Sequence, residues 1–298
     1  MIAYIQYLFL KGFGFFVNLL PENFSLSLGR SMGKIGYFLD WEHRKVALEN
    51  LRIAFGQEKS EEEIRSIAKR TFQNLGMMSV EFFRIHRMDA EAFKTRLEIE
   101  GLANFEKVRN NKKGALLLLS HFGNWELMGL LTKGLGSQVM VIAKPVRKNK
   151  WVDRMITDIR ESSGLEVVPS EKASRKILQA LSQNRMVGIL IDQRAKLSEG
   201  VMADFFGRKA STTPALAVLG MRTGAPILPL YLLRNGTGKY RLVIREPIEL
   251  IQTGDVKNDV VANTELVNRS LEGMIRQYPD QWFWVHRRWE RKKSGRRH

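Results

Sequence analysis

The sequence has 298 residues with 44% hydrophobic residues, 24 Gly and 8 Pro, which excludes a disordered or fibrous chain and allows a substantial core. It contains no Cys, which excludes disulfides, thiolate metal sites and a cysteine nucleophile. The formal net charge of +17 predicts an anionic partner, either nucleic acid, acidic headgroups, an acidic substrate or an acidic carrier protein.

The first twenty residues are almost wholly apolar and aromatic, interrupted only by Gln6, Lys11 and Asn18. A helix needs about 20 apolar residues to cross a bilayer, so this segment is marginal in length. We predict that residues 1–22 form a membrane anchor that lies in the bilayer or enters it obliquely; a core helix is the alternative. A cleavable signal peptide would need a basic start and a cleavage site, which are missing. Basic residues follow the segment and no charged side chain precedes it. This distribution predicts that the rest of the protein lies on the cytoplasmic side of the membrane.

Helical patterns follow the anchor. Apolar residues at helical spacing predict helices over 24–39 and 46–55, and a capping box at 60–63 opens a helix that runs to about residue 84. The first third of the chain is therefore predicted to be helical.

From about residue 97 short apolar runs alternate with helical patterns. The predicted strands cover 97–100, 115–120, 138–143, 166–168, 186–191, 227–233 and 240–245. The predicted helices cover 102–111, 124–135, 149–163, 171–183, 213–223 and 261–278. This alternation predicts an α/β fold with a mostly parallel, twisted sheet flanked by helices. With no repeat or linker in the sequence, we expect residues 23–298 to form one domain with a basic tail.

Three motif searches are negative. Residues 29–33 match the G-x-S-x-G nucleophile elbow, but the strands that an elbow needs do not precede them. We expect instead that Gly29, Gly33 and Gly36 let two helices approach closely. The five His are too scattered for a zinc site, and no phosphate-binding glycine loop stands between a strand and a helix. We therefore expect neither a metal nor a cofactor.

The informative stretch is Ser120-His121-Phe122-Gly123-Asn124-Trp125-Glu126, which follows a buried strand. We expect Asn124 to cap the next helix and Glu126 to lie in its first turn. His121 in the turn can then meet Glu126, whose carboxylate would fix its tautomer and make it a general base. A histidine that only caps the turn is the alternative, and the residues alone do not decide between them.

This stretch resembles the H-x4-D/E signature of the lysophospholipid acyltransferase superfamily, in the form found in the late acyltransferases of lipid A biosynthesis. Further blocks resemble that family in order, at residues 191–193, 200–213, 223–229 and 282–289. The resemblance covers nearly the whole chain, including the hydrophobic N-terminus.

The resemblance implies a role for several residues. His121 would take the proton of an acceptor hydroxyl, which then attacks a thioester directly, and Glu126 would orient His121. Arg160 best matches the family's site arginine, with Arg154 as the alternative. Asp192 matches a later acidic position that would order the same site, although a strand-end Asp can instead bind its own loop. Lys144 follows another strand and could meet a phosphate or be a solvated turn residue.

The resemblance also implies the partners. The donor would be an acyl chain on acyl carrier protein and the acceptor a phosphorylated, acylated glycolipid, in an enzyme on the cytoplasmic face of the inner membrane. Both partners are anionic, which fits the net charge and the basic tail from residue 287 onward. We expect Trp282, Trp284 and Trp289 to contact the membrane surface beside this tail.

Two alternatives stay open. One is an acyltransferase of the same superfamily that acts on another glycolipid or on a lysophospholipid. The other is a nucleic-acid-binding protein, which is disfavoured because no recognised binding motif is present and the apolar N-terminus would be unexplained.

Overall fold

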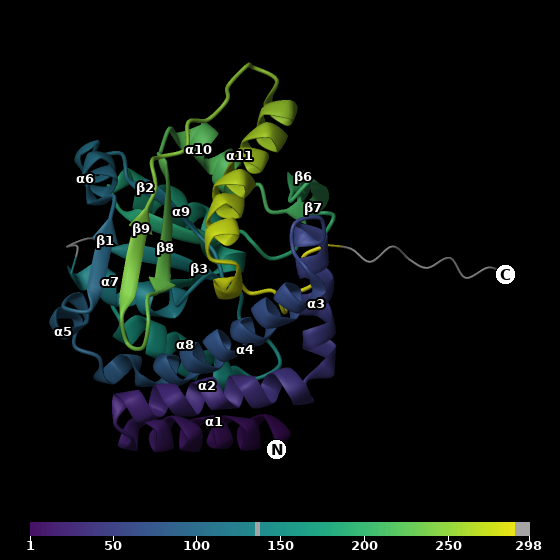
Figure 1. Ribbon diagram of the computed structural model, residues 1–298. Helices are drawn as coiled ribbons and strands as arrows, with labels where there is room; N and C mark the ends of the chain where they lie inside the picture. Colours follow the sequence, from purple (N-terminus) through teal and green to yellow (C-terminus); the bar gives the residue numbers. More distant parts are fainter. Residues whose placement is uncertain (135–137, 290–298) are drawn as a thin grey trace.

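A computed structural model describes residues 1–134 and 138–289 and contains a seven-stranded sheet (Figure 1). In spatial order its strands are β1 (Leu97–Glu100), β9 (Tyr240–Ile244), β8 (Ile227–Arg234), β2 (Ala115–Leu119), β5 (Met186–Leu190), β3 (Val139–Ala143) and β4 (Leu165–Pro169). Only the β8–β9 pair is antiparallel among these neighbours. The predicted mostly parallel sheet is therefore confirmed.

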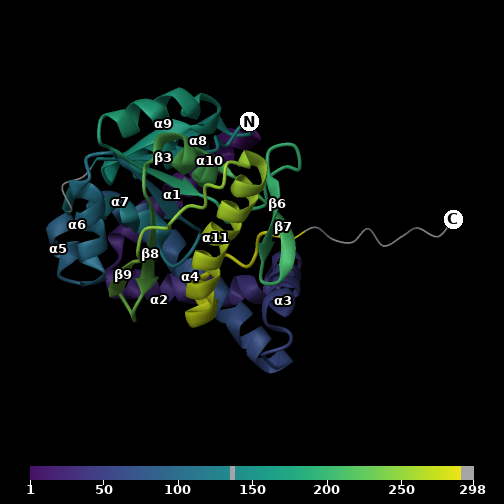
Figure 2. The same ribbon diagram turned by 90° about the horizontal axis from the view of Figure 1, so that it is seen from above.

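Helices cover both faces of the sheet (Figure 2). One face packs against α5 (Ala90–Lys94), α6 (Leu102–Asn110) and α7 (Met128–Gly134), and the other against α9 (Ala173–Ser182), α10 (Ala215–Thr223) and α11 (Val256–Gln277). Every residue of strand β2 is apolar because both of its faces are buried. Leu116 and Leu118 pack into one core, and Leu117 and Leu119 pack into the other. Successive side chains point to opposite faces, and both faces are covered.

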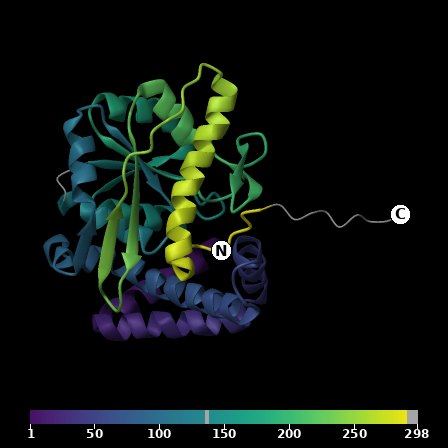
Figure 3. The same ribbon diagram turned by 45° about the horizontal axis from the view of Figure 1, so that its top comes forward.

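The N-terminal third is helical, as predicted, with α1 (Ile2–Leu19), α2 (Glu22–Leu39), α3 (Trp41–Phe55) and α4 (Glu61–Arg84). The capping box at the start of α4 is formed, because the Ser60 hydroxyl accepts from the Glu63 N–H and the Glu63 carboxylate accepts from the Ser60 N–H. Helices α1 and α2 form the bottom layer of the molecule in Figure 1, and Figure 3 shows α2 along the bottom of the turned view. Helix α8 (Lys150–Ser162) packs on β4 and on α1.

Glycines let α2 and α4 approach closely, as predicted for Gly29 and Gly33. The same expectation for Gly36 is wrong, because a Cβ there would make only an ordinary contact with the Phe72 ring. A Cβ on Gly29 would lie 2.7 Å from the carbonyl oxygen of Gly76, and one on Gly33 would overlap the carbonyl oxygen of Phe72. Gly76 on α4 faces this crossing in turn. The G-x-S-x-G match is therefore a helix crossing, with Ser31 exposed on the surface of α2.

One hairpin and several short elements were not predicted. Strands β6 (Val201–Phe205) and β7 (Arg208–Thr212) pair outside the main sheet, and the turn between them has Phe206 and Gly207 at positive φ. Two-residue hairpins favour such turns, but Phe is unusual at positive φ, so the sequence carries no standard turn signal here. The single-turn helices are η1 (Ile85–Arg87), η2 (Trp125–Leu127), η3 (Ser170–Lys172) and η4 (Pro279–Gln281).

The tryptophans near the C-terminus are buried, so the expectation that they contact the membrane is wrong. The exposed fractions of Trp282, Trp284 and Trp289 are 2%, 0% and 4%. Their rings pack among aromatic side chains such as Phe205, and each indole N–H finds an oxygen within the protein. Arg288 is also fully buried and donates to Ser211 and Thr212. The tail beyond residue 289 lies outside the described residues.

We predict that Gly33→Ala lowers the free energy of unfolding by about 1–3 kcal/mol, because the added methyl forces α2 away from α4. Gly36→Ala on the same helix is the matched control: its Cβ would lie 3.7 Å from the Phe72 ring, and Ala is favoured over Gly in helices by about 1 kcal/mol. Urea denaturation measures both. Equal stability of the two variants would contradict the close crossing.

His286 predicts a pH-dependent stability. Burial lowers the pKa of His286 to about 4, so the unfolded chain binds a proton between pH 6.5 and 4 that the folded chain does not. The wild-type free energy of unfolding should therefore fall over this range as the pH is lowered, and the fall should be smaller in His286→Gln. Denaturant titrations at several pH values measure the difference. Parallel curves for the two proteins would contradict the prediction.

Candidate active site

His121 lies just beyond the carboxyl end of β2 and is held by Asp192, which follows the neighbouring strand β5. Its Nδ1 lies 2.8 Å from Asp192 Oδ1, and its backbone N–H donates to Asp192 Oδ2 at 2.9 Å. These residues are 71 positions apart in sequence. The parallel pairing of β2 with β5 brings them together, because the carboxyl ends of parallel strands meet at one edge of a sheet. The expectation that Asp192 joins this site agrees with the contact.

Asp192 is 2% exposed and accepts a third hydrogen bond, 2.8 Å long, from Trp282 Nε1. Burial alone would raise its pKa, but the charge of His121 and the hydrogen bonds from His121 and Trp282 outweigh it, so the pKa lies below its usual value. The carboxylate is therefore ionised at neutral pH. An ionised acceptor assigns the imidazole proton to Nδ1.

His121 is among the residues that line a cavity. Its ring packs against Trp125 and Phe283, with ring centroids 5.0 Å and 5.6 Å away, and those two rings lie 5.9 Å from each other. The side-chain amide of Gln193 lies 3.4 Å from Nε2, at the limit of a hydrogen bond. With Nδ1 protonated, the lone pair on Nε2 is available to a substrate hydroxyl, which is the requirement for a general base.

Glu126 does not take the expected position beside His121. It lies in the first turn of η2, as predicted, but its carboxylate accepts from Arg160 Nε at 2.9 Å and from an Arg160 terminal nitrogen at 2.7 Å. Among the described residues it makes no hydrogen bond to His121; the Nδ1 position belongs to Asp192. The turn through Gly123 directs the two side chains to different partners.

Arg160 is the arginine that the structure places at the site. Burial would lower its pKa, but the hydrogen bonds and charge of Glu126 outweigh that effect and raise it. Arg154 is 74% exposed and pairs with Asp158 on the surface of α8. Arg160 and Glu126 both line the cavity, as does Lys144 at the carboxyl end of β3.

The expected helix cap at Asn124 is wrong. Its side chain makes no capping hydrogen bond and instead donates to Glu81 Oε2 at 2.5 Å. Glu81 is buried on α4 and also accepts from Arg234 and the Tyr240 hydroxyl. A buried carboxylate with a cationic partner forms a stronger, charge-assisted hydrogen bond to the amide than the neutral backbone of a single-turn helix does. Asn124 therefore ties the His121 loop to α4.

The C-terminal segment closes the other side of this loop. The Phe283 N–H donates to the His121 carbonyl oxygen at 3.0 Å, and the Gly123 N–H donates to the Gln281 carbonyl oxygen at 2.8 Å. Sequence reasoning missed Glu81 and Gln281. Trp282 was assigned to the membrane surface, although it stands in a block that resembles the acyltransferases. No local pattern marked Glu81, which lies 43 residues from its partner Asn124.

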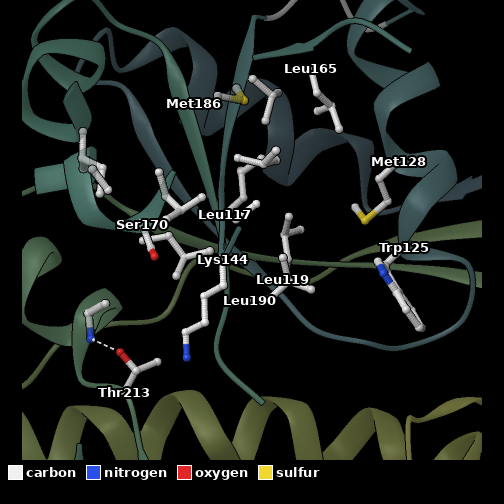
Figure 4. Close-up of a pocket in the computed structure, with 18 of the residues that line it drawn as sticks. Leu117, Leu119, Trp125, Met128, Lys144, Leu165, Ser170, Met186, Leu190 and Thr213 are labelled. Atoms are coloured by element: carbon white, nitrogen blue, oxygen red, sulfur yellow. Dashed lines mark hydrogen bonds between the residues drawn. The ribbon is translucent and has the colours of Figure 1, made fainter. Parts of the chain in front are cut away.

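The cavity has a volume of about 730 Å³ and is lined by residues within the strands and by residues that follow the carboxyl ends of β2, β3 and β5 (Figure 4). Its deep part is apolar and is lined from the strands by residues including Leu117, Leu119, Val139, Val141 and Met186. Figure 4 shows Leu119, Met128 and Leu165 beside this space, with Trp125 at its side. Sites of this size and lining hold small apolar molecules or chains. Within residues 1–134 and 138–289, no group of three or more His, Cys, Asp or Glu could hold a metal ion.

The chain is similar in sequence to known bacterial acyltransferases. The chain is 27% identical over 278 residues to the lipid A biosynthesis palmitoleoyltransferase of Escherichia coli K12, covering 93% of this chain and 88% of the relative. It is 25% identical over 282 residues to the lauroyltransferase of the same organism, with the same coverage of 93% and 88%. It is 28% identical over 214 residues to a phosphatidylinositol mannoside acyltransferase of Mycolicibacterium smegmatis, covering 70% and 67%. The bacterial lipid A biosynthesis acyltransferase family matches residues 1–291, and the chain therefore belongs to this family.

Proposed function

We propose that this protein transfers a fatty acyl chain from an acyl carrier protein thioester to a hydroxyl of a lipid A precursor, on the cytoplasmic face of the inner membrane. The observation that carries the proposal is His121, held by Asp192 at an apolar cavity of about 730 Å³. Membership of the family supports acyl transfer in lipid A biosynthesis.

The reaction needs one base and no covalent intermediate. His121 Nε2 takes the proton of the acceptor hydroxyl as its oxygen attacks the thioester carbonyl carbon. The tetrahedral intermediate then expels the thiolate, which takes the proton back from the imidazolium. Asp192 holds the ring in the productive tautomer and stabilises the imidazolium, the role that a buried carboxylate plays beside a catalytic histidine.

The Glu126–Arg160 pair would stabilise the negative charge that develops on the thioester carbonyl oxygen during attack. Glu126 accepts two hydrogen bonds from Arg160 and thereby fixes the guanidinium in the wall of the cavity. An arginine in a bidentate pair retains further N–H donors. These donors can bind the oxyanion of the tetrahedral intermediate, where fixed donors stabilise charge more than water does.

The apolar part of the cavity suits the acyl chain. Leu117 and Leu119 of β2, Val139 and Val141 of β3 and Met186 of β5 line it from one face of the sheet, and Ile142 and Ile189 line it from the other. The comparisons support the identity of the acceptor less strongly than they support acyl transfer. A relative named for a different glycolipid, phosphatidylinositol mannoside, aligns over 70% of the chain. Mass spectrometry of lipids from cells with and without the protein identifies the acceptor.

The exposed apolar side chains of helices α1 and α2 support the proposed contact with a membrane. Helix α1 is long and apolar enough to cross a bilayer, with only 11% of its residues buried. Its exposed apolar side chains include Ile2, Ile5, Phe9 and Phe16, and those of α2 include Phe24, Met32, Ile35 and Phe38. Exposed Trp41 and Trp151 lie near these helices in the chain or in contact with them. Apolar patches of this kind mark membrane or protein contacts, and Trp is favoured at the interface.

Contacts at both ends fasten α1 to the body of the protein. The Asn149 side chain donates to the Ala3 carbonyl oxygen at 2.8 Å, and Arg84 donates to the carbonyl oxygens of Val17 and Leu20. Gly14 packs against the Phe83 ring on α4. A helix that left the body to cross the bilayer would lose these partners. We therefore propose that α1 lies in the plane of the membrane together with α2.

For the catalytic group, we predict that His121→Ala lowers kcat at least 10²- to 10⁴-fold, because a positioned general base contributes about that much. Asp192→Asn should lower kcat while the KM for the acceptor changes little, since it disturbs the tautomer rather than binding. His43→Ala on the exposed surface of α3 is the control. Transfer from acylated carrier protein to a radiolabelled acceptor measures all three. Near-normal turnover by His121→Ala would refute the mechanism.

For the membrane, the absence of Cys allows single spin labels at Ile2→Cys, Phe9→Cys and Phe16→Cys. In vesicles of anionic phospholipid we predict similar, shallow depths for all three labels, because an interfacial helix is buried by about 5–10 Å. A label at Glu62→Cys, exposed on α4, should stay in water. A crossing helix would instead place the label at position 9 deepest, with positions 2 and 16 towards opposite sides.

A further inference from the structure

The cavity has a deep arm on one face of the sheet and a shallow arm on the other. The strand residues that line the deep arm reach from the first to the last residue of β5 and include Leu119, Val139, Val141, Met186 and Leu190 (Figure 4). On the opposite face, the described residues of β2, β3 and β5 that line the cavity are Ile142 and Ile189, each the fourth of its strand. The shallow arm therefore stays near the carboxyl ends of the strands, where Ala215 of α10 also lines it.

Gly188 is in the middle of the strand floor of the deep arm. It is the third residue of β5 and pairs in register with Leu117 of β2 and Val141 of β3. Alternate residues of a strand point to the same face, so a side chain at position 188 would point to the deep arm. Its Cβ would lie 2.6 Å from Leu119 Cδ1 and 3.3 Å from Val141 Cγ1. Gly188 therefore makes room for the end of the Leu119 side chain within the floor, and a methyl group there would displace that side chain into the arm.

The position of Gly188 can be expressed as a length of hydrocarbon. Its register partner Leu117 is four positions before His121, and an extended strand rises about 3.3 Å per residue, which gives about 13 Å. An extended hydrocarbon advances about 1.3 Å per carbon, because its bonds of about 1.5 Å zigzag. A chain that starts at His121 therefore reaches the level of Gly188 after about ten carbons. Further carbons would lie beside Val139 and Met186, the first residues of β3 and β5.

We propose that the deep arm binds the acyl chain of the donor and that Gly188 determines how long a chain the arm accepts. This inference rests on the proposed function for the identity of the donor and adds the arm that binds it and the residue that limits it. The burial of each methylene strengthens binding by about fourfold, as long as the arm has room for it. A side chain at position 188 would remove that gain for the carbons beyond about the tenth.

Binding of radiolabelled saturated fatty acids, from octanoic to hexadecanoic acid, tests the arm without turnover. The Kd of the wild type should fall by about fourfold per added methylene across the series. The Kd of Gly188→Ala should fall equally up to about ten carbons and then level off. Ala215→Val adds bulk to the shallow arm and is the matched control, which should follow the wild type. The same chain-length limit in Gly188→Ala and the wild type, or a shortened limit in Ala215→Val, would overturn the proposal.

A compensating substitution separates the loss of space from a folding defect. Leu119→Val removes the Cδ1 atom that the new methyl group would meet. The Leu119→Val/Gly188→Ala double variant should therefore bind long chains more tightly than Gly188→Ala does. If the double variant is no better, the displacement of Leu119 is not the cause, and the role of Gly188 is overturned. Thermal denaturation of each variant shows which of them fold.

Transfer kinetics then tests whether the bound chain is that of the donor. The ratio of kcat/KM for hexadecanoyl carrier protein to that for decanoyl carrier protein should be at least about tenfold lower in Gly188→Ala than in the wild type, since the fourfold loss accumulates over several methylenes. A general loss of activity would not change this ratio. An unchanged ratio would overturn the assignment of the deep arm to the donor. If the wild type transfers no chain from any donor, the proposed function is refuted, and the fatty acid series still decides whether Gly188 limits the arm.

Discussion

The hydrogen bonds of Asp192 are the interaction on which the site depends. One buried carboxylate receives the imidazole and backbone N–H of His121 and the indole N–H of Trp282. It thereby joins two parallel strands to the C-terminal segment. A carboxylate inside a protein is tolerated only when such partners satisfy it, because removing it from water costs several kcal/mol. The need to satisfy Asp192 thus holds the C-terminal segment against the loop that carries His121.

A second buried carboxylate supports the same loop from the opposite side. Glu81 on α4 binds Asn124, Arg234 and Tyr240, and removal of one member of such a pair would leave a charge without a partner at a cost of about 3–5 kcal/mol. Helix α4 also packs on α1 and α2. The loop that carries His121 is therefore fastened to the helical layer proposed to lie on the membrane. In the proposed orientation, this arrangement would fix the height of the cavity above the lipid surface.

The parallel sheet explains why polar and apolar parts of the cavity are adjacent. Strands β2, β3 and β5 end at one edge, so the residues that follow them, His121, Lys144 and Asp192, gather there. Inside the strands, alternate side chains are apolar on both faces. A molecule with a charged head and a hydrocarbon chain matches that order of surfaces.

The sequence by itself determined the features that depend on local pattern. The capping box at Ser60, the close-approach glycines on α2 and the alternation of strands and helices follow from residue chemistry within one or two turns. His121 could also be selected as a candidate base, from its place after a buried strand and from the motif that resembles the acyltransferases. Asp192 and Arg160 were identified only by resemblance, without their partners.

Only the tertiary structure decided which carboxylate each group meets. Glu126 is five residues from His121 but binds Arg160, while Asp192, 71 residues away, binds His121. Strand order sets these contacts, and sequence spacing does not encode it. The tryptophans at 282, 284 and 289 show the same limit. An aromatic and basic segment has the composition of a membrane interface, but here the indole rings complete a core whose other half comes from β6, β7 and α3.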